Sequence, residues 1–301
     1  MDDADWDDTG AILRSRFFRT RHGHEGSQDS RLPEASNEVE KAIEYLSKVR
    51  GCKTPQESLR LAVRLGFYTG DDWARLFDEQ PRCDDLVLDT SFLRVAETSW
   101  LEAGGVFWGS QIAPAISPIY EMSSTRSNAS SSGSTSSQWT VKLSISSIDY
   151  KQLRLTGTME AFTDAKTNIK TYFEGEIIDF NGHSLQTLTF ASTLGDDANN
   201  WRKLDPFVCL SNHELVKCLV SRKFMKELND RWLFLRIKEL DFISPVPEAD
   251  VGGLTIGGFY YLALRRDDGR IQGYYYDSQS QPFQELTLMP NKRLFPSYEF
   301  R

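Results

Sequence analysis

The sequence predicts a mainly β protein in which a small helical segment precedes the strands. From about residue 105 onward, apolar and polar residues alternate in many short segments that are joined by polar turns. This pattern is typical of an antiparallel barrel or sandwich. Before it, residues 37–80 carry apolar residues at helical spacing behind helix start signals. The 301 residues, 40% of them hydrophobic, suffice for one large domain or two modest ones.

The composition excludes several classes of protein. A net charge of −8 argues against general nucleic-acid binding. No run approaches the roughly 20 apolar residues that span a bilayer, and the acidic start Met1–Asp5 is unlike a secretory signal. We therefore expect a cytoplasmic protein, with the nucleus as a second location, and no metal or cofactor. The four cysteines lack zinc-ligand spacing and are expected to be reduced thiols: Cys52, Cys83, Cys209 and Cys218.

Helix signals are clear between residues 37 and 80. Asn37 is expected to cap a first helix with Glu40 at the third position, and Gly51 to end it. Thr54–Glu57 is a stronger start, because it combines a cap, a proline in the first turn and a capping-box glutamate. A third, shorter helix is expected over residues 71–78.

The predicted organisation has three parts. Residues 1–35 form a polar, disordered tail. A helical segment covers residues 36–100, and a β domain covers residues 101–301. The β domain contains a serine-rich flexible loop at residues 123–138 and a helical insertion at about residues 198–229.

Strand candidates fill the β domain, and alternation is clearest from Trp139 to Ile145. A tight link, Asp267–Gly269, is expected to be a hairpin turn between two of them. The further candidates are Gln152–Ala161, Thr171–Ile178, Leu185–Ala191, Arg231–Asp241, Gly257–Arg266, Arg270–Asp277 and Phe283–Met289.

A single acid, Glu239, ends an apolar strand in a region rich in tyrosine. Tyr260 and Tyr275 lie on neighbouring predicted strands and are expected to face the same cavity. Tyrosines offer rigid contact area with a polar end, so a carboxylate among them indicates a pocket for a cationic group. The alternative is a solvated carboxylate at a strand end, beside tyrosines that only pack a barrel.

A second pair of acids, Glu174 and Glu176, lies on one face of a predicted strand. Paired carboxylates are the acid and base of glycosidases, although such pairs usually come from different segments. The sequence contains neither a nucleophile elbow nor a phosphate-binding glycine loop.

An ordered set of short motifs runs through the last two thirds of the chain. It resembles the vacuolar-import-and-degradation family, the substrate receptors of the GID (CTLH) E3 ubiquitin ligase. The motifs are Phe107–Gln111, Tyr172–Ile178, Trp201, Arg236–Glu239, Gly258–Tyr261, Gly273–Tyr276, Gln284 and Tyr298–Arg301.

The resemblance implies a fold and a function. The fold is an eight-stranded, lipocalin-like antiparallel β-barrel with helical insertions. The function is that of a non-catalytic receptor, which binds the free N-terminus of a substrate, typically proline, so that the protein is ubiquitinated and degraded by the proteasome. The implied partner is an armadillo-repeat scaffold subunit of the ligase.

The resemblance also implies roles for individual residues. Glu239 receives the N-terminal ammonium and Tyr260 is its hydrogen-bonding partner. Ile237 stands where the family usually has tryptophan. The implied pocket lining is Gln111, Met159, Phe162, Ile169, Gly253, Thr255, Ile256, Tyr275 and Gln284, and the implied docking residues are Tyr298, Glu299, Phe300 and Arg301.

Two other functions remain open at this point. A lipocalin-like carrier of a small apolar ligand would also need an aromatic barrel. A carbohydrate-active enzyme would use Glu174 and Glu176. Neither explains the motifs near the C-terminal end.

Overall fold

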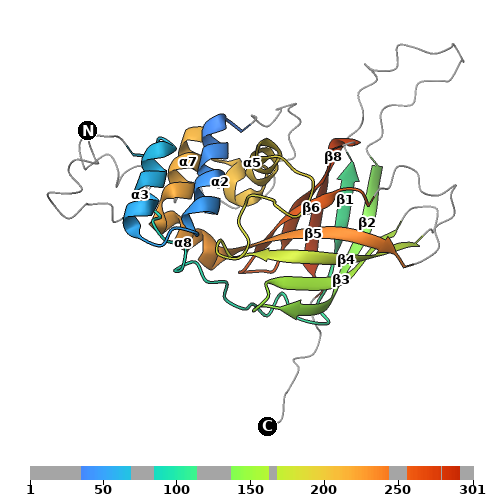
Figure 1. Ribbon diagram of the computed structural model, residues 1–301. Coiled ribbons are helices and arrows are strands. Elements are labelled where there is room, and N and C mark those ends of the chain that lie inside the picture. Colours follow the sequence, from blue (N-terminus) through green and yellow to red (C-terminus); the bar gives the residue numbers. More distant parts are fainter. Residues whose placement is uncertain are drawn as a thin grey trace, which may run out of the picture. The chain divides into compact units, whose positions relative to one another are not determined.

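The computed structural model describes two compact units (Figure 1). A helical unit comprises Met1–Val95 and Ile178–Trp232, and a barrel unit comprises Ala96–Ile177 and Leu233–Arg301. Within these bounds the structure describes residues 35–68, 85–113, 137–162, 168–243, 256–278 and 280–291. None of the helices in these ranges is long and apolar enough to cross a membrane.

The barrel unit is a closed barrel of eight strands in sequence order, as the resemblance implies. The first strand pairs antiparallel with the second and also with the last, and this second pairing closes the barrel. The strands are β1 (Val106–Ala113), β2 (Ser137–Asp149), β3 (Arg154–Phe162), β4 (Asn168–Ile178), β5 (Trp232–Phe242), β6 (Phe259–Arg265), β7 (Ile271–Asp277) and β8 (Ser280–Pro290).

The strands β2 to β8 lie on strand candidates of the sequence, whereas β1 was not among them. Its alternation is weak, because Gly109 and Gln111 face the interior while Trp108, on the other face, is 40% exposed. Gly109 is required there, since a Cβ would lie 1.8 Å from the carbonyl oxygen of Thr287 on β8.

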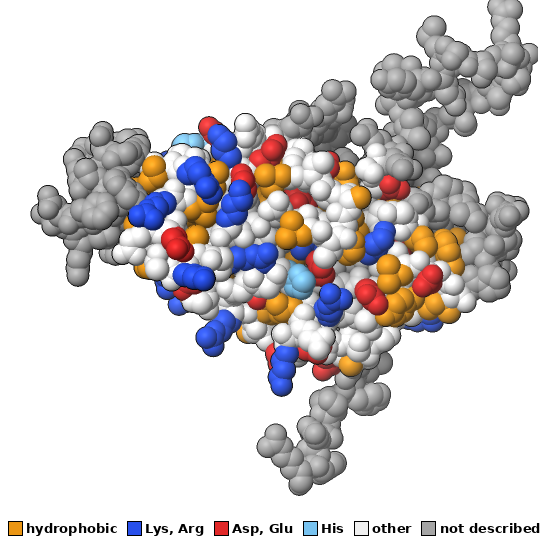
Figure 2. All heavy atoms as spheres, in the orientation of Figure 1, with side chains coloured by type: hydrophobic (Ala, Val, Ile, Leu, Met, Phe, Trp, Pro, Cys, Tyr) orange, Lys and Arg blue, Asp and Glu red, His pale blue; other side chains and the backbone are white. Residues whose placement is uncertain are grey.

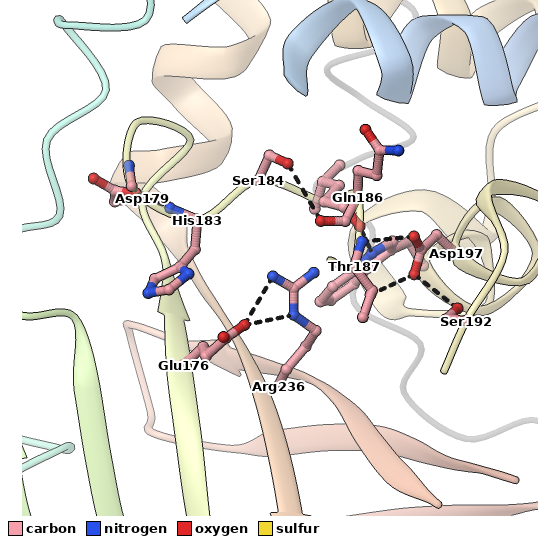
Figure 3. A network of polar contacts seen from close by, with 12 residues as sticks. Glu176, Asp179, His183, Ser184, Gln186, Thr187, Ser192, Asp197 and Arg236 are labelled. Atoms are coloured by element: carbon pink, nitrogen blue, oxygen red, sulfur yellow. Dashed lines mark hydrogen bonds and ion pairs between the residues drawn. The ribbon is translucent and has the colours of Figure 1, made fainter. Parts of the chain in front are cut away.

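The expectation of a strand at Leu185–Ala191 is wrong, because this segment is a loop. The carboxylate of Asp197, which is fully buried, accepts hydrogen bonds from the backbone N–H of Thr187 (2.7 Å) and the hydroxyl of Ser192 (3.3 Å) (Figure 3). The backbone N–H of Thr187 is thus bonded to a side chain and is not available to pair with a neighbouring strand. Leu185 and Thr187 are buried, whereas Leu188 is 67% exposed.

Alternate residues of the strands fill the barrel with an apolar core. A Cβ on Gly157 of β3 would lie 2.1 Å from the Ser144 carbonyl oxygen and 2.6 Å from the Phe173 ring, so glycine is needed for this packing. Buried residues on inward positions include Phe107, Leu143, Phe173, Leu235, Ile237, Leu262 and Leu286.

A buried ion pair joins β4 to β5. The guanidinium of Arg236 lies 3.0 Å (Nη2) and 3.1 Å (Nε) from the Glu176 carboxylate, and both residues are buried (Figure 3). Both nitrogens contact the same carboxylate oxygen, Oε2, so the pair combines opposite charges with charge-assisted hydrogen bonding.

The hairpin between β6 and β7 turns at Asp267–Gly269, as predicted. Gly269 has a positive φ of 74°. The Trp100 ring covers it so closely that a Cβ would lie 2.6 Å from a ring carbon, and the indole N–H donates to the Arg266 carbonyl (2.9 Å). This hairpin follows the end of β6, so it lies at the end of the barrel away from Tyr260.

In the helical unit, α2 packs against α3, α5 and α7 (Figure 1). The predicted cap at Asn37 is wrong: Asn37 is the first helical residue, and Ser36 occupies the cap position without a side-chain hydrogen bond. The Thr54 cap is confirmed, since its side chain accepts from the Glu57 N–H. The helices are α2 (Asn37–Val49), α3 (Pro55–Arg64), α5 (Leu194–Arg202), α6 (Asp205–Val208), α7 (Asn212–Val220) and α8 (Arg222–Arg231).

The helices α7 and α8 lie where the spacing predicts helix, and Ser211 and Ser221 cap them. The expected helix at residues 71–78 lies outside the described residues, as do the predicted tail up to residue 34 and most of the serine-rich segment. The thiols of Cys52, Cys209 and Cys218 are free, and Cys83 also lies outside the described part.

Replacing Gly157 with alanine should destabilise the barrel, because the new methyl group would overlap the Ser144 carbonyl and the Phe173 ring. We expect a loss of about 1–3 kcal/mol in the free energy of unfolding, measured by urea denaturation. Gly51→Ala is the control, since its Cβ would meet nothing closer than 3.4 Å. Equal stability of the two variants would contradict the close packing at Gly157.

Candidate functional site

A cavity of about 30 Å³ opens at the end of the barrel where β5 finishes and β6 begins. Every strand contributes at least one residue to it, so it exists only because the barrel is closed. The lining residues are Gln111, Val141, Met159, Ala161, Ile169, Thr171, Glu239, Phe242, Ile256, Tyr260, Tyr275 and Gln284.

The carboxylate of Glu239 is the only acidic group among these lining residues, and the residue is 8% exposed. The hydroxyl of Thr171 donates to one carboxylate oxygen. The hydroxyl of Tyr260 lies 3.3 Å from the other. Two strands next to β5 in the barrel, β4 and β6, thus supply the donors.

Both donors are shared with other acceptors. The Thr171 hydroxyl also lies 3.3 Å from the Met159 carbonyl oxygen, and the Tyr260 hydroxyl lies 3.2 Å from the side-chain oxygen of Gln111. A hydroxyl carries one proton, so it satisfies one acceptor at a time. The described residues that line the cavity include no lysine, arginine or histidine. Among the described lining residues the buried carboxylate therefore meets no cation, and Lys238 acts on its pKa from outside the lining.

Burial raises the pKa of Glu239, and hydrogen bonds from Thr171 and Tyr260 and the charge of Lys238 oppose this shift only in part. Burial also raises the pKa of Tyr260 well above its ordinary value, and the Glu239 charge adds to this. Tyr260 is therefore a neutral phenol. A cation that entered the cavity would favour the ionised form of Glu239.

On the other side of Tyr260 lies a second polar group. The Gln111 amide donates to the side-chain oxygen of Gln284, which links β1 to β8. The rings of Tyr260 and Tyr275 are 4.9 Å apart at 58°, and the Tyr275 hydroxyl accepts a hydrogen bond from the N–H of Gly258 (2.8 Å). These amides and hydroxyls suit the backbone of an extended peptide.

The remaining wall is apolar and reaches the rim of the barrel. On the face that Figure 2 shows, hydrophobic side chains gather over the adjoining ends of β4 and β5. At the end of β5, Phe242 is 40% exposed and also lines the cavity. The site therefore combines one buried anion with a small apolar wall, which suits an ammonium group attached to a compact apolar body.

The structure brings together most of the residues that the resemblance assigns to the pocket. Phe162 is an exception, because it does not line the cavity and its ring stacks on Trp108 at 5.6 Å. Gly253, Thr255 and the four residues from Tyr298 to Arg301 lie outside the described residues. Those that line the cavity are Gln111, Met159, Ile169, Glu239, Ile256, Tyr260, Tyr275 and Gln284.

Four lining residues were not among the predicted site residues: Val141, Ala161, Thr171 and Phe242. The alternation of β4 contains the signal for Thr171, which lies two positions after Ile169 on the same face. Thr171 is a polar residue on an otherwise apolar face of this strand, and that contrast could have identified it as a site residue.

The pair Glu174 and Glu176 does not form a catalytic pair of acids. Glu174 is exposed, and the Tyr172 hydroxyl lies 3.3 Å from it. Glu176 is buried in its contact with Arg236. This geometry gives no support to a carbohydrate-active enzyme, and the described residues contain no cluster of ligands that could hold a metal ion.

Glu239→Gln should stabilise the protein at neutral pH. An acid whose pKa is higher in the folded state costs stability as the pH rises from its unfolded value, about 4.3, through the folded value. The variant removes this cost, so its melting temperature should exceed that of the wild type at pH 7.5 and approach it near pH 4. Glu174→Gln, at an exposed site, should change neither value. A lower melting temperature for Glu239→Gln at pH 7.5 would contradict the absence of a compensating cation.

A known protein family matches the part of the chain that contains this cavity. The family model described as vacuolar import and degradation protein matches residues 100–291, which include every described residue of the cavity. The GID complex substrate-recognition subunit 10 of Schizosaccharomyces pombe is 31% identical over 219 residues, which cover 69% of this chain and 37% of the relative. This chain thus spans little more than a third of that relative's length.

Shorter relatives align over more of their own length. The glucose-induced degradation protein 4 homolog of Mus musculus is 29% identical over 193 residues, which cover 62% of this chain and 84% of the relative. The GID complex substrate-recognition subunit 10 of Saccharomyces cerevisiae is 26% identical over 199 residues, with 52% and 65% covered. The family match over the barrel, together with these relatives, shows that the chain belongs to the vacuolar import and degradation protein family.

Proposed function

We propose that this chain is a substrate-recognition subunit of a GID-type E3 ubiquitin ligase complex and that it binds the free N-terminus of its substrates. Three similar proteins carry the name of GID complex substrate-recognition subunits or of a glucose-induced degradation protein. The observation that carries the proposal is the buried Glu239 carboxylate, beside which the described lining of the cavity holds hydroxyl donors but no cation.

An N-terminal ammonium supplies what this carboxylate lacks. It brings a positive charge and N–H donors, so the Thr171 and Tyr260 hydroxyls can return to their other acceptors. A buried charge is tolerated only with a partner and satisfied hydrogen bonds. Acetylation of the N-terminus would remove the charge and add bulk, and both changes oppose binding.

The apolar part of the wall favours a compact apolar first residue, and proline fits this description. Proline keeps two N–H groups on its ammonium and presents a small ring. A cavity of about 30 Å³ has room for water but not for a ring, so the lining side chains must move when the peptide enters. This movement costs free energy and should keep the affinity modest.

The same volume argues against a carrier of small apolar ligands. Ligand pockets usually enclose about 300–1,000 Å³, whereas this cavity encloses about 30 Å³ and half of its lining residues are polar or carry a polar group. A carrier would have no use for a buried carboxylate.

The rest of the proposal concerns the assembly. The receptor is non-catalytic, docks to an armadillo-repeat scaffold subunit and presents substrates for ubiquitination and proteasomal degradation in the cytoplasm, with the nucleus as a second location. Tyr298–Arg301 are proposed as docking residues. The basis for this part is family membership alone.

The full chain should bind a short peptide that starts with proline, with a Kd in roughly the micromolar range, and should not bind the N-acetylated copy. Isothermal titration calorimetry measures both. Glu239→Gln should weaken binding of the free peptide by at least about tenfold, because a buried charged contact is worth at least about 1.4 kcal/mol. Equal binding of the free and acetylated peptides, or wild-type affinity of Glu239→Gln, would refute the ammonium contact.

Peptide affinity should also depend on pH. The ammonium binds the ionised carboxylate, and burial raises the pKa of Glu239, so affinity should fall as the pH is lowered through this raised value, already above the ordinary value of about 4.3. Below it the Kd should rise about tenfold per pH unit. Titrations between pH 5 and 7.5 measure the effect. A Kd that is constant down to pH 4.5 would mean that Glu239 is not the titrating partner.

A further inference from the structure

Lys238 precedes Glu239 on β5, so by the alternation of the strand its side chain leaves the opposite face of the sheet. Its ammonium nitrogen lies 3.3 Å from the carbonyl oxygen of Ile256, 2.9 Å from that of Gly257 and 3.1 Å from that of Gly258. An ammonium has three N–H donors. Three consecutive backbone carbonyls therefore use the full capacity of this side chain.

The three residues, here called the 256–258 segment, lead directly into β6. The first of them, Ile256, lines the cavity. The last, Gly258, donates its N–H to the Tyr275 hydroxyl at 2.8 Å, and a Cβ at this position would lie 2.1 Å from the Tyr276 carbonyl oxygen. The segment is thus held by Lys238 through its carbonyls and by Tyr275 through an N–H.

These contacts form a path that returns to Glu239. Lys238 holds the 256–258 segment, the segment contacts Tyr275, the Tyr275 ring packs on Tyr260, and the Tyr260 hydroxyl reaches the Glu239 carboxylate. The path begins and ends at neighbouring residues of β5. Displacing the segment would therefore move Ile256 and also release the Tyr275 hydroxyl from the Gly258 N–H.

We propose that Lys238 is a positioning residue that clamps the 256–258 segment and so preorganises the cavity for its ligand. The inference rests on the proposed function for the identity of that ligand. Lys238 does not line the cavity, so it acts through the segment and not by touching the peptide. Preorganisation raises affinity because the cost of ordering the site is met before the ligand arrives.

Lys142 is the matched control. It lies on β2, and its ammonium contacts the carboxylate of Glu160, 3.2 Å away, on β3. Lys142→Met removes the same charge from the barrel without touching the 256–258 segment. A general effect of lost barrel charge would thus appear in both variants. The charge of Lys238 also lowers the pKa of Glu239, so weaker peptide binding by Lys238→Met supports the clamp only together with faster hydrogen exchange over residues 256–262.

The experiment compares the full-length wild type, Lys238→Met and Lys142→Met in two measurements. Hydrogen exchange of the ligand-free proteins, followed by mass spectrometry, reports on residues 256–262, and β2 serves as the internal reference for global opening. We expect Lys238→Met to exchange faster over residues 256–262 but not over β2, and to bind the proline peptide about tenfold more weakly. Lys142→Met should match the wild type in both measurements.

Two results would overturn the proposal: unchanged exchange over residues 256–262 in Lys238→Met, or faster exchange with wild-type peptide affinity. If Lys238→Met melts far below Lys142→Met, Lys238→Gln, which keeps two N–H donors, takes its place under the same criteria. If the wild type binds no peptide, the proposed function fails, and the exchange result alone decides whether Lys238 clamps the segment.

Discussion

The pairing of β1 with β8 is the constraint on which the site depends. It closes the barrel, so eight strands from distant parts of the sequence direct side chains into one small volume. Gln111 on β1 and Gln284 on β8 meet across this seam, and Gly109 permits the close approach of the two strands. An open sheet of the same strands would leave Glu239 in water with an ordinary pKa and with no reason to hold a cation.

The same closure makes the ionised form of Glu239 energetically unfavourable, because it buries the carboxylate. Burial opposes its charge, and the two hydroxyls that face it have competing acceptors, so the ligand-free protein carries a carboxylate that is only partly compensated. By contrast, Glu176, another buried acid of the barrel, has a guanidinium against it. The contrast distinguishes a buried charge that has a partner from one that meets none in the described lining of the cavity. A buried charge of the second kind favours a ligand of opposite charge, as proposed above.

Much of the fold follows from local patterns. Alternation locates β2 to β8, and the cap at Thr54 and the hairpin glycine at Gly269 follow from local chemistry. Local pattern fails at β1, where the interior positions after Phe107 are Gly109 at the seam and Gln111 in the cavity. It also fails at Leu185–Ala191, where the buried Asp197 captures the backbone donor of Thr187. In both places a contact with a distant residue decides the outcome, and no window of sequence contains it.

The sequence by itself determined the class of fold and the family, because short motifs in a fixed order carry that information, and it predicted a site at Glu239 and Tyr260. Only the tertiary structure decided which side chains share the cavity. It added Thr171 to the carboxylate, placed the Phe162 ring on Trp108 and brought Lys238 to the carbonyls of the 256–258 segment. The physical reason is that burial and shared hydrogen-bond donors are properties of packed neighbours, and packing is settled only when the barrel closes.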